Sequence, residues 1–352
     1  MFKRVLMAVA VAAAVSAPAF AEVSISGSAE MDLFYRTNQT ADGNGKVWEE
    51  VAIVINIDGK DKLDSGDTLK WRVAQKVATD YRYDSFGGRE AWIGYQGGWG
   101  ELRFGTQFTN SYLMLYWPYG VKGTGNLWAD FGAHTDKWKD AVSYFSPNWG
   151  GFSFAAQYKL GSQDDASNTN GLDLTASFGT DMFNIDAGYQ GNYDQLVAAH
   201  SVGASGTSVS DAVVNGASTE VYHVGTRVRF GDFALRAGYK YNQWDLGTVG
   251  NSDVNFSQYL VGGTFGFGKN AISLSYQLKD EVEVRGVDYD NEIQQVAFQW
   301  DYALSKNTGA FLQARHQWFD EKKVALPGWA LDGWNGKESS VSRVLVGTWT
   351  GF

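Results

Sequence analysis

Most of the chain after residue 22 alternates apolar and polar residues with a period of two. In the first such stretch, residues 23–33, Val23 and Ile25 occupy one set of positions and Ser24 and Glu30 occupy the other. Because successive side chains of a β-strand point to opposite faces, this pattern predicts a strand with one apolar and one polar face. The pattern recurs as far as the C-terminus, so the sequence predicts an all-β protein.

Short turns and long polar connections alternate between the predicted strands. We count sixteen strands and eight long connections, and an even number places both ends of the mature chain at the short-turn rim. Strand fifteen, near Ala310–Phe319, alternates least regularly. The long connections are expected near Arg36–Lys46, Ala78–Phe86, Phe108–Asp140, Gly161–Asn170, Gly191–Thr219, Trp244–Asp253, Asp280–Asn291 and Asp320–Ser339.

This arrangement favours a transmembrane antiparallel β-barrel over a soluble β-sandwich. A sandwich would also alternate, but it would not require eight long loops on one side. Outward aromatic residues near many strand ends also fit the interfacial girdles of outer-membrane barrels. Hydrocarbon offers no hydrogen-bond partner to a free strand edge, so such a sheet must close on itself.

The first 21 residues have the layout of a secretory signal peptide. A basic start precedes the apolar run Val5–Val15, and Ala19–Ala21 is a small-x-small cleavage site. The run is shorter than the roughly 20 residues that a membrane-spanning helix needs. We therefore expect residues 1–21 to be removed, and residues 22–352 to form the barrel in the outer membrane of a Gram-negative bacterium.

The composition excludes several other classes of protein. The chain has no Cys, which removes disulfides and thiolate sites together. Cleavage of the signal peptide would leave 27 basic and 39 acidic residues, a net charge of about −12. An acidic balance argues against nucleic acid as a partner. No other apolar run approaches the length of a spanning helix, as expected when only every second strand residue faces lipid.

The segment Phe108–Asp140 is too long and too irregular for a turn. It combines many aromatic residues with charged ones, so it is unlikely to lie free in water. We expect this segment to fold into the lumen of the barrel and narrow it, although a surface loop with packed aromatics is the alternative. Its aromatic candidates for stacking against a solute are Tyr112, Tyr116, Trp117, Tyr119 and Trp128.

Several motifs, in the right order, resemble those of the Gram-negative general porins. Asp140–Phe154 is similar to the family segment V-x-Y-x-S-P-x-F-x-G-F, and Asp301–Thr308 is similar to its D-Y-x-L-S-K-x-T turn. Arg89–Gly94 followed by Gly100–Gly105 resembles its fourth and fifth strands. The terminal Phe352 matches the aromatic end that serves as an assembly signal in such proteins.

The resemblance implies a homotrimer of sixteen-stranded barrels, each with its third loop folded inside. In the family, acidic groups on that loop face basic residues on the opposite wall. Arg89 falls at a family basic position, but the positions on strands two and six fall near Ile53–Val54 and Phe145, so the usual arginine ladder is in doubt. The loop signature P-E-F-G-G-D is absent, and Asp130–Gly132 is its nearest remnant.

Opposed charges across a narrow lumen would orient polar solutes and set ion preference. The overall acidity predicts a mild preference for cations. The acidic candidates for the constriction are Asp130, Asp136 and Asp140. The basic candidates are Lys70, Arg72, Arg89 and Arg103, with Arg227 and Arg229 as further basic wall residues.

The function expected from these observations is passive diffusion of small hydrophilic solutes and ions. A sugar-selective porin that stacks its substrate on the aromatic residues of the third loop is the alternative. The four His residues are scattered, and no nucleophile elbow or metal-ligand spacing occurs, so we expect no enzyme, cofactor or metal. The expected partners are outer-membrane lipid, lipopolysaccharide, two further copies of the chain, and permeating solutes. An adhesin role for the loop Gly191–Thr219 stays open.

Overall fold

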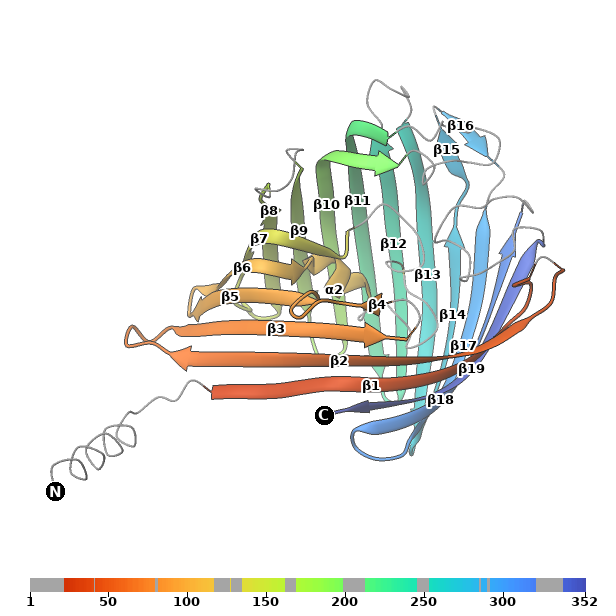
Figure 1. Cartoon of the computed structure of the whole chain (residues 1–352), viewed down its shortest axis with the longest axis horizontal. Helices are drawn as coiled ribbons and strands as arrows, with labels where there is room; N and C mark the ends of the chain where they lie inside the picture. Colours follow the sequence, from red (N-terminus) through yellow and green to blue (C-terminus); the bar gives the residue numbers. More distant parts are fainter. Residues whose placement is uncertain are drawn as a thin grey trace.

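The computed structural model describes residues 22–40, 42–79, 82–116, 127, 135–161, 169–198, 213–245, 253–284, 286–289, 292–320 and 338–352. These residues form one antiparallel sheet that closes on itself (Figure 1). The proposed signal peptide lies outside the described residues. Among the described residues, no helix is both long enough and apolar enough to cross a membrane.

The wall of the barrel consists of sixteen strands, as predicted, and the described chain has three further short strands beside it. Each wall strand pairs with its neighbours in sequence, and β1 pairs with β19 to close the ring. The wall strands are β1 (Glu22–Arg36), β2 (Lys46–Lys62), β3 (Thr68–Ala78), β5 (Glu90–Gly97), β6 (Gly100–Phe108), β7 (Lys137–Phe145), β8 (Phe152–Lys159), β9 (Asn170–Gly179), β10 (Phe183–Ala198), β11 (Val213–Phe230), β12 (Phe233–Asp245), β13 (Asp253–Phe267), β14 (Asn270–Lys279), β17 (Ile293–Ala303), β18 (Thr308–Phe319) and β19 (Ser340–Gly351). The other elements are β4 (Arg82–Tyr83), β15 (Val282–Val284), β16 (Val287–Tyr289) and the helix α2 (Asn110–Tyr116).

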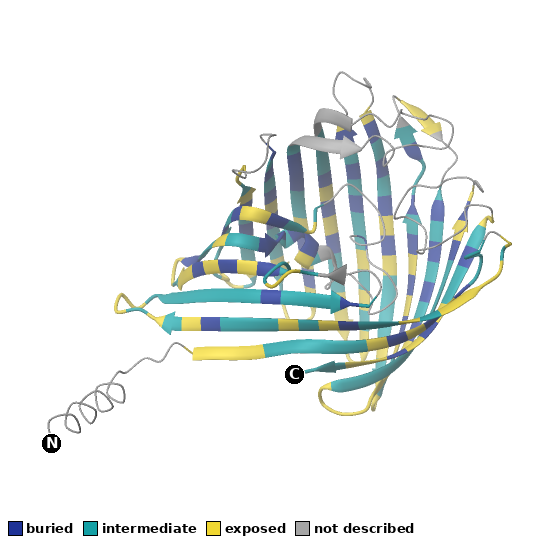
Figure 2. Ribbon diagram, viewed as in Figure 1, coloured by how far each residue is buried: buried dark blue, intermediate teal, exposed yellow. Residues whose placement is uncertain are grey.

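The two faces of the wall carry the two sets of alternating residues. Figure 2 shows exposed and buried bands taking turns along β9 to β14. On β11, Tyr222 and Val224 are exposed on the outer face, whereas His223 is buried on the inner face. The outer face offers apolar side chains to lipid, which is the arrangement that a membrane barrel requires. Strand β18 exists despite its irregular alternation.

Some boundaries differ from the expected ones because paired strands extend beyond their alternating segments. Strand β2 continues to Lys62, so only a short turn separates it from β3. Strands β10 and β11 extend well into the expected loop Gly191–Thr219, where their pairing is irregular. Backbone pairing with a neighbour holds these segments in the sheet even though their side chains do not alternate cleanly.

The inner face is less uniformly polar than the alternation suggests. Toward the long-loop rim it carries the buried apolar residues Phe34, Leu345 and Phe256 beside polar ones. Phe34 stacks on Trp48 with ring centroids 5.4 Å apart, and the Arg36 guanidinium lies 4.3 Å from the Trp48 ring. Burial of apolar area stabilises this part of the wall from inside as well as outside.

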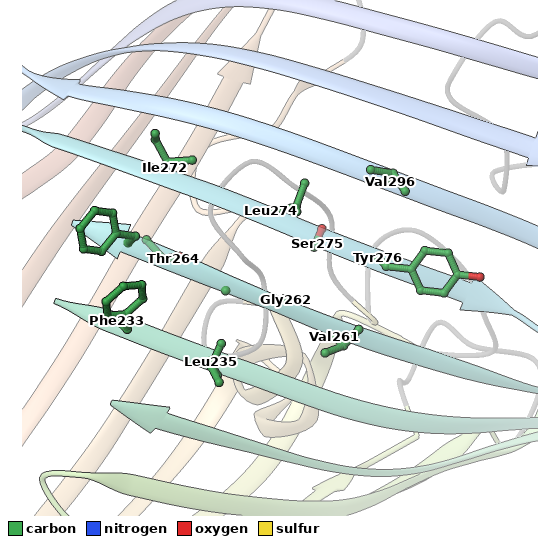
Figure 3. A pocket seen from close by; sticks show the side chains of 12 residues that line it. Phe233, Leu235, Val261, Gly262, Thr264, Ile272, Leu274, Ser275, Tyr276 and Val296 are labelled. Atoms are coloured by element: carbon green, nitrogen blue, oxygen red, sulfur yellow. The ribbon is translucent and has the colours of Figure 1, made fainter. Parts of the chain in front are cut away.

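The outer face has aromatic residues at two levels. Tyrosines such as Tyr189 and Tyr222 lie toward the long loops, and Phe233 and Phe265 lie near the short turns. On the same face, an apolar groove of about 470 Å³ lies over β12 to β14, with Leu235, Val261 and Leu274 in its lining (Figure 3). Such girdles fit a wall embedded between two membrane interfaces.

The ring closes at the short-turn rim, where both ends of the described chain lie. Gly27 N donates to Phe352 O at 3.0 Å, and Phe352 N donates back to Gly27 O at 3.1 Å. A β-carbon added at Gly27 would lie 2.8 Å from Phe352 Cζ and would also clash with the carbonyl oxygen of Val54. Glycine at position 27 therefore makes room for the terminal ring.

Candidate functional site

The segment after β6 begins with the helix α2, which the sequence analysis did not predict. Its first residues are bound to inward-facing side chains of three strands, β8, β9 and β11. Ser111 N donates to Asp173 Oδ2 of β9 at 3.2 Å, and Ser111 Oγ lies 2.8 Å from His223 Nε2 of β11. Asn110 N donates to Gln157 of β8, and Gln157 Nε2 donates to Phe108 O at 3.1 Å. The helix is therefore anchored on the inner face of the barrel.

The returning arm of the segment binds the same part of the wall. Gln190 of β10 accepts from Thr135 N at 2.7 Å and donates to Thr135 O at 3.1 Å. Gln190 also donates to Asp173 Oδ2 at 3.1 Å, which links the two arms. Trp138 is fully buried and donates from Nε1 to Asn192 Oδ1 at 3.0 Å. We call Gln157, Asp173, Gln190, Asn192 and His223 the anchoring wall.

Between the two arms, the described residue Leu127 contacts β12. A β-carbon added at Gly238 would lie 2.6 Å from Leu127 Cδ1, and Leu127 is 1% exposed. Glycine at position 238 thus leaves a space on the inner face that the leucine fills. The contact extends the attachment of the segment from β8 as far as β12.

A second group of side chains lies on the inner face of β2, β3, β5 and β6. It contains three basic and three acidic groups, and each basic group has an acidic partner. We call this group the paired wall. Its members are Asp58, Lys70, Arg72, Glu90, Glu101 and Arg103.

Arg72 is the centre of the paired wall. Its guanidinium binds both oxygens of Asp58, at 2.7 and 3.1 Å, and reaches Glu90 Oε2 at 3.3 Å. Such a bidentate arrangement fixes the planar group more firmly than a single contact would. Trp92 Nε1 donates to the other oxygen of Glu90 at 3.1 Å, so that carboxylate has partners on both sides.

The other half of the paired wall shares a single carboxylate. Glu101 accepts from Lys70 Nζ at 2.9 Å and also from Arg103. The Arg103 guanidinium lies between two aromatic rings, 4.3 Å from Trp92 and 4.5 Å from Phe145. These cation–π contacts restrict the movement of the Arg103 side chain. A cleft of about 310 Å³ runs along these residues.

The basic candidates from the sequence thus occupy three places. Lys70, Arg72 and Arg103 lie together on the paired wall, whereas Arg89 directly precedes β5 and has its guanidinium 4.9 Å from the Phe108 ring. Lys137 donates to Gly88 O next to it, which ties the returning arm to the same corner. Arg227 and Arg229 lie on the inner face of β11, beyond His223 toward the short turns.

The acidic candidates are not brought together in the described residues. Asp136 precedes β7 and its backbone oxygen accepts from Thr109 N at 2.9 Å. Asp140 is exposed in β7, where the pairing with β6 shifts register, and its φ is 52°. Asp130 lies outside the described residues, so the acidic side of the constriction stays a prediction.

The aromatic candidates are described only in part. Tyr112 is 9% exposed and stacks on Phe108 with ring centroids 4.9 Å apart. Tyr116 is described for its backbone only, as the last residue of α2. Trp117, Tyr119 and Trp128 lie outside the described residues. A solute-stacking role for these aromatics stays a prediction.

Sequence reasoning missed the anchoring wall as a functional group of residues. Asp173 was visible only as a polar member of an alternating strand, Asn192 fell in the expected loop Gly191–Thr219, and His223 was one of four scattered histidines. The signal that could have found them is their fixed period on three neighbouring strands. Within the described residues, no group of three or more His, Cys, Asp or Glu could hold a metal ion.

Comparisons with known proteins agree with this geometry. A family model described as Gram-negative porin matches residues 8–322. Among curated proteins, the chitoporin of Vibrio furnissii is 26% identical, over 83% of this chain and 87% of that protein. The major outer membrane protein P.IB of Neisseria meningitidis is 27% identical, over 88% of this chain and 92% of that protein.

Solved porin structures share the fold at low sequence identity. The anion-selective porin from Comamonas acidovorans superposes with a TM-score of 0.73 at 16% identity, covering 95% of this chain and all of that one. OmpT of Vibrio cholerae in its trimer form gives 0.70 at 15% identity, covering 94% and 99%. With its closed sixteen-stranded wall and a family match over most of its length, the chain belongs to the Gram-negative porin family, the outer-membrane channels.

Proposed function

We propose that this porin passes small hydrophilic solutes and ions by passive diffusion, and that the narrowest part lies between the anchored segment and the paired wall. The observation that carries the proposal is the attachment of α2 and Thr135 to the inner face, through Asp173 and Gln190. A segment fixed at both arms keeps a constant width, which a passive channel needs.

Charged side chains on the paired wall support a polar solute path. A solute that carries its own dipole can exchange part of its hydration for contacts with these groups, whereas an apolar solute loses hydration without replacement. The wall is neutral in sum, so it orients solutes without strongly favouring one sign. Acidic groups on the segment, with Asp130, Asp136 and Asp140 as candidates, would complete the transverse field.

Planar-bilayer recording of the purified, detergent-extracted protein tests the proposal. We expect stepwise ohmic currents in potassium chloride and a mild cation preference in the reversal potential across a salt gradient. Absence of conductance would refute the channel, and a strong anion preference would refute the acidic assignment of the segment. Because the relatives named above are porins, we also propose that the chain has no enzymatic activity.

We further propose a homotrimer in contact with outer-membrane lipid and lipopolysaccharide, formed after cleavage before Glu22. The structure of Vibrio cholerae OmpT titled as a trimer form supports the assembly state. The apolar outer face and its aromatic girdles support the contact with lipid. Cross-linking in native membranes and N-terminal sequencing of the mature protein would test these points.

A sugar-selective channel is the second candidate, because one curated relative is named a chitoporin. Stacking of sugar rings on Tyr112, Tyr116, Trp117, Tyr119 and Trp128 would supply the selectivity. The Phe108 ring covers one face of Tyr112, which leaves less of that ring for a sugar. Current block by chito-oligosaccharides at micromolar concentration would favour this candidate, and block only at millimolar concentration would favour the general channel.

A further inference from the structure

The apolar groove on the outer face of β12, β13 and β14 is bounded by aromatic rings at both ends (Figure 3). Phe233 and Phe265 stack with ring centroids 4.5 Å apart at the end near the short turns, and Tyr276 lies at the other end. Leu235 and Leu274 lie between these rings and are exposed. The groove therefore offers an apolar space that opens away from the wall.

The groove has about the length of one membrane leaflet. Its lining on β13 runs from Val261 to Phe265, which is four residue steps of about 3.3 Å each, or ~13 Å. The hydrocarbon core of a bilayer is ~30 Å thick, so each leaflet supplies about half of that thickness. Short turns of outer-membrane barrels face the periplasm, and Phe265 is at the short-turn end. The groove therefore lies beside the acyl chains of the periplasmic leaflet.

Trp300 marks the level at which this leaflet ends. Its ring is exposed on the outer face of β17, and its Nε1 donates to Asn270 Oδ1 at 3.0 Å. An indole ring has an apolar body and one polar N–H, so it prefers the boundary between hydrocarbon and headgroups. Lys269 directly precedes Asn270, in the turn between β13 and β14. This lysine therefore lies at the level of the lipid headgroups.

Two neighbouring short turns carry opposite charges at this level. Asp232 lies in the turn between β11 and β12, and its backbone oxygen accepts from Gly266 N at 2.9 Å, next to the turn that carries Lys269. Both side chains are exposed. The salt bridges of the described residues involve neither of them. The two charges are therefore available to a ligand that carries one anionic and one cationic group.

We propose that the groove and these two turns form a binding site for one phospholipid of the periplasmic leaflet, with a headgroup that carries a phosphate and a primary ammonium. An acyl chain occupies the groove, the phosphate binds Lys269 and the ammonium binds Asp232. A primary ammonium has three N–H donors for the carboxylate, whereas a quaternary ammonium has none. The proposal rests on the lipid contact proposed above and names the lipid class and its place on the wall.

A second copy of the chain is the other occupant that an apolar groove on the outer face suggests. Specific protein interfaces bury about 1,200–2,000 Å², and a groove of ~13 Å on three strands supplies only a small part of that area. Charged residues are also depleted at the centres of such interfaces, whereas Asp232 and Lys269 lie beside the groove. Both observations favour lipid as the occupant.

Native mass spectrometry of the mature protein in detergent tests the proposal. The probes are synthetic phosphatidylethanolamine, phosphatidylcholine and phosphatidylglycerol with identical acyl chains. We expect phosphatidylethanolamine to bind about fivefold more tightly than the other two lipids, as two exposed charge contacts would give. The variant D232N/K269Q is expected to fold, because both side chains are exposed in turns, and to lose this preference.

The matched control for the charges is K62Q/D64N, which removes one basic and one acidic exposed side chain beside the turn between β2 and β3. It should keep the preference for phosphatidylethanolamine, and an equal loss in control and variant would overturn the site. In V261W, a large side chain fills the groove, so binding of phosphatidylethanolamine should fall to the level of the other lipids. I185W, on the outer face of β10 and outside the groove, should bind as wild type does.

The remaining outcomes separate this site from the general contact with lipid. Equal binding of the three lipids by wild type would overturn the site and leave the general lipid contact in place. A V261W variant that loses its trimer but keeps the headgroup preference would assign the groove to a second copy instead. A wild-type protein that stays monodisperse without detergent would refute the lipid contact itself, and the site with it.

Discussion

The side-chain amide of Gln190 makes two hydrogen bonds to the backbone of Thr135, accepting at 2.7 Å and donating at 3.1 Å. The same amide also donates to Asp173, which holds Ser111 at the start of α2. One side chain of β10 therefore connects the two arms of the segment Phe108–Asp140. Loss of this side chain should loosen the segment without opening the wall.

The substitution Q190A tests this connection. Each net hydrogen bond stabilises by about 1 kcal/mol, so we expect the anchored segment to lose about 2 kcal/mol of local stability. The expected result is greater open-channel noise and more frequent closures at high voltage, with an unchanged unfolding midpoint of the barrel. Single-channel recording and urea unfolding in detergent provide these two measurements.

A glutamine elsewhere on the inner face provides the control for Q190A. Gln299 of β17 is also buried, and its side chain donates to Asp301 on the same strand and accepts from Gln313 on the neighbouring strand β18. We expect Q299A to leave the current noise as in wild type. Similar noise in both variants would mean that Gln190 acts only as a general wall residue.

The contact between Leu127 and Gly238 predicts a change in pore width. In G238L, the new side chain would occupy the space of Leu127 and push the segment away from β12, so conductance should fall. The double variant G238L/L127A exchanges the large and small residues and should recover most of the conductance. A double variant as narrow as G238L, measured under the same salt and voltage, would contradict the size-exchange argument.

Removal of Arg72 should change both stability and ion preference. R72Q leaves Asp58 and Glu90 without their cationic partner, so we expect the free energy of unfolding to fall by about 2 kcal/mol. Breaking a fully buried pair costs ~3–5 kcal/mol, but the Arg72 side chain is 32% exposed, which lowers the cost. The two released carboxylates should raise the potassium-to-chloride permeability ratio. The control R72Q/D58N should shift that ratio less, and an unaltered reversal potential in R72Q would place the paired wall away from the ion path.

The close packing of Gly27 against Phe352 predicts that a larger residue at position 27 impairs assembly. In G27A, the added methyl group would meet the Phe352 ring and the Val54 backbone, and overpacking of this kind costs about 1–3 kcal/mol. We expect less heat-resistant folded protein in membranes from G27A and from F352A. G309A, where an added β-carbon has its nearest neighbour at 3.5 Å, should assemble normally; if it fails equally, the glycine argument is wrong.

Strand number and closure were predictable because alternation is a local signal with strict consequences in lipid. A segment such as Val23–Leu33 can satisfy both hydrocarbon and water only as a strand of a closed sheet. The ends of β10 and β11 were not predictable, because backbone pairing extends there without alternating side chains. The helix at Asn110–Tyr116 has a Thr cap, because Thr109 Oγ1 accepts from Tyr112 N at 3.3 Å, but with seven residues it depends on tertiary contacts such as that of Ser111 with Asp173.

The sequence predicted the basic residues of the paired wall but not their acidic partners. Lys70 and Arg72 stood out as basic residues at alternate positions of a strand, and they do lie on the same inner face. Their acidic partners belong to other strands, so strand register decides which carboxylates reach them. Local sequence does not show the strand register. For the same reason, the pairing of Arg227 with Arg236 across β11 and β12 was found only in the structure.

The pairing of β1 with β19 also has a consequence for biogenesis. Ser28 lies opposite Gly351, so the first and the last strand of the wall seal the cylinder. A chain that lacked β19 would leave one edge of β1 and one edge of β18 without hydrogen-bond partners. The bilayer core supplies no partners for such edges. We therefore expect a variant that lacks β19 to fail to insert, because β1 and β18 would then have no strand between them to complete the ring.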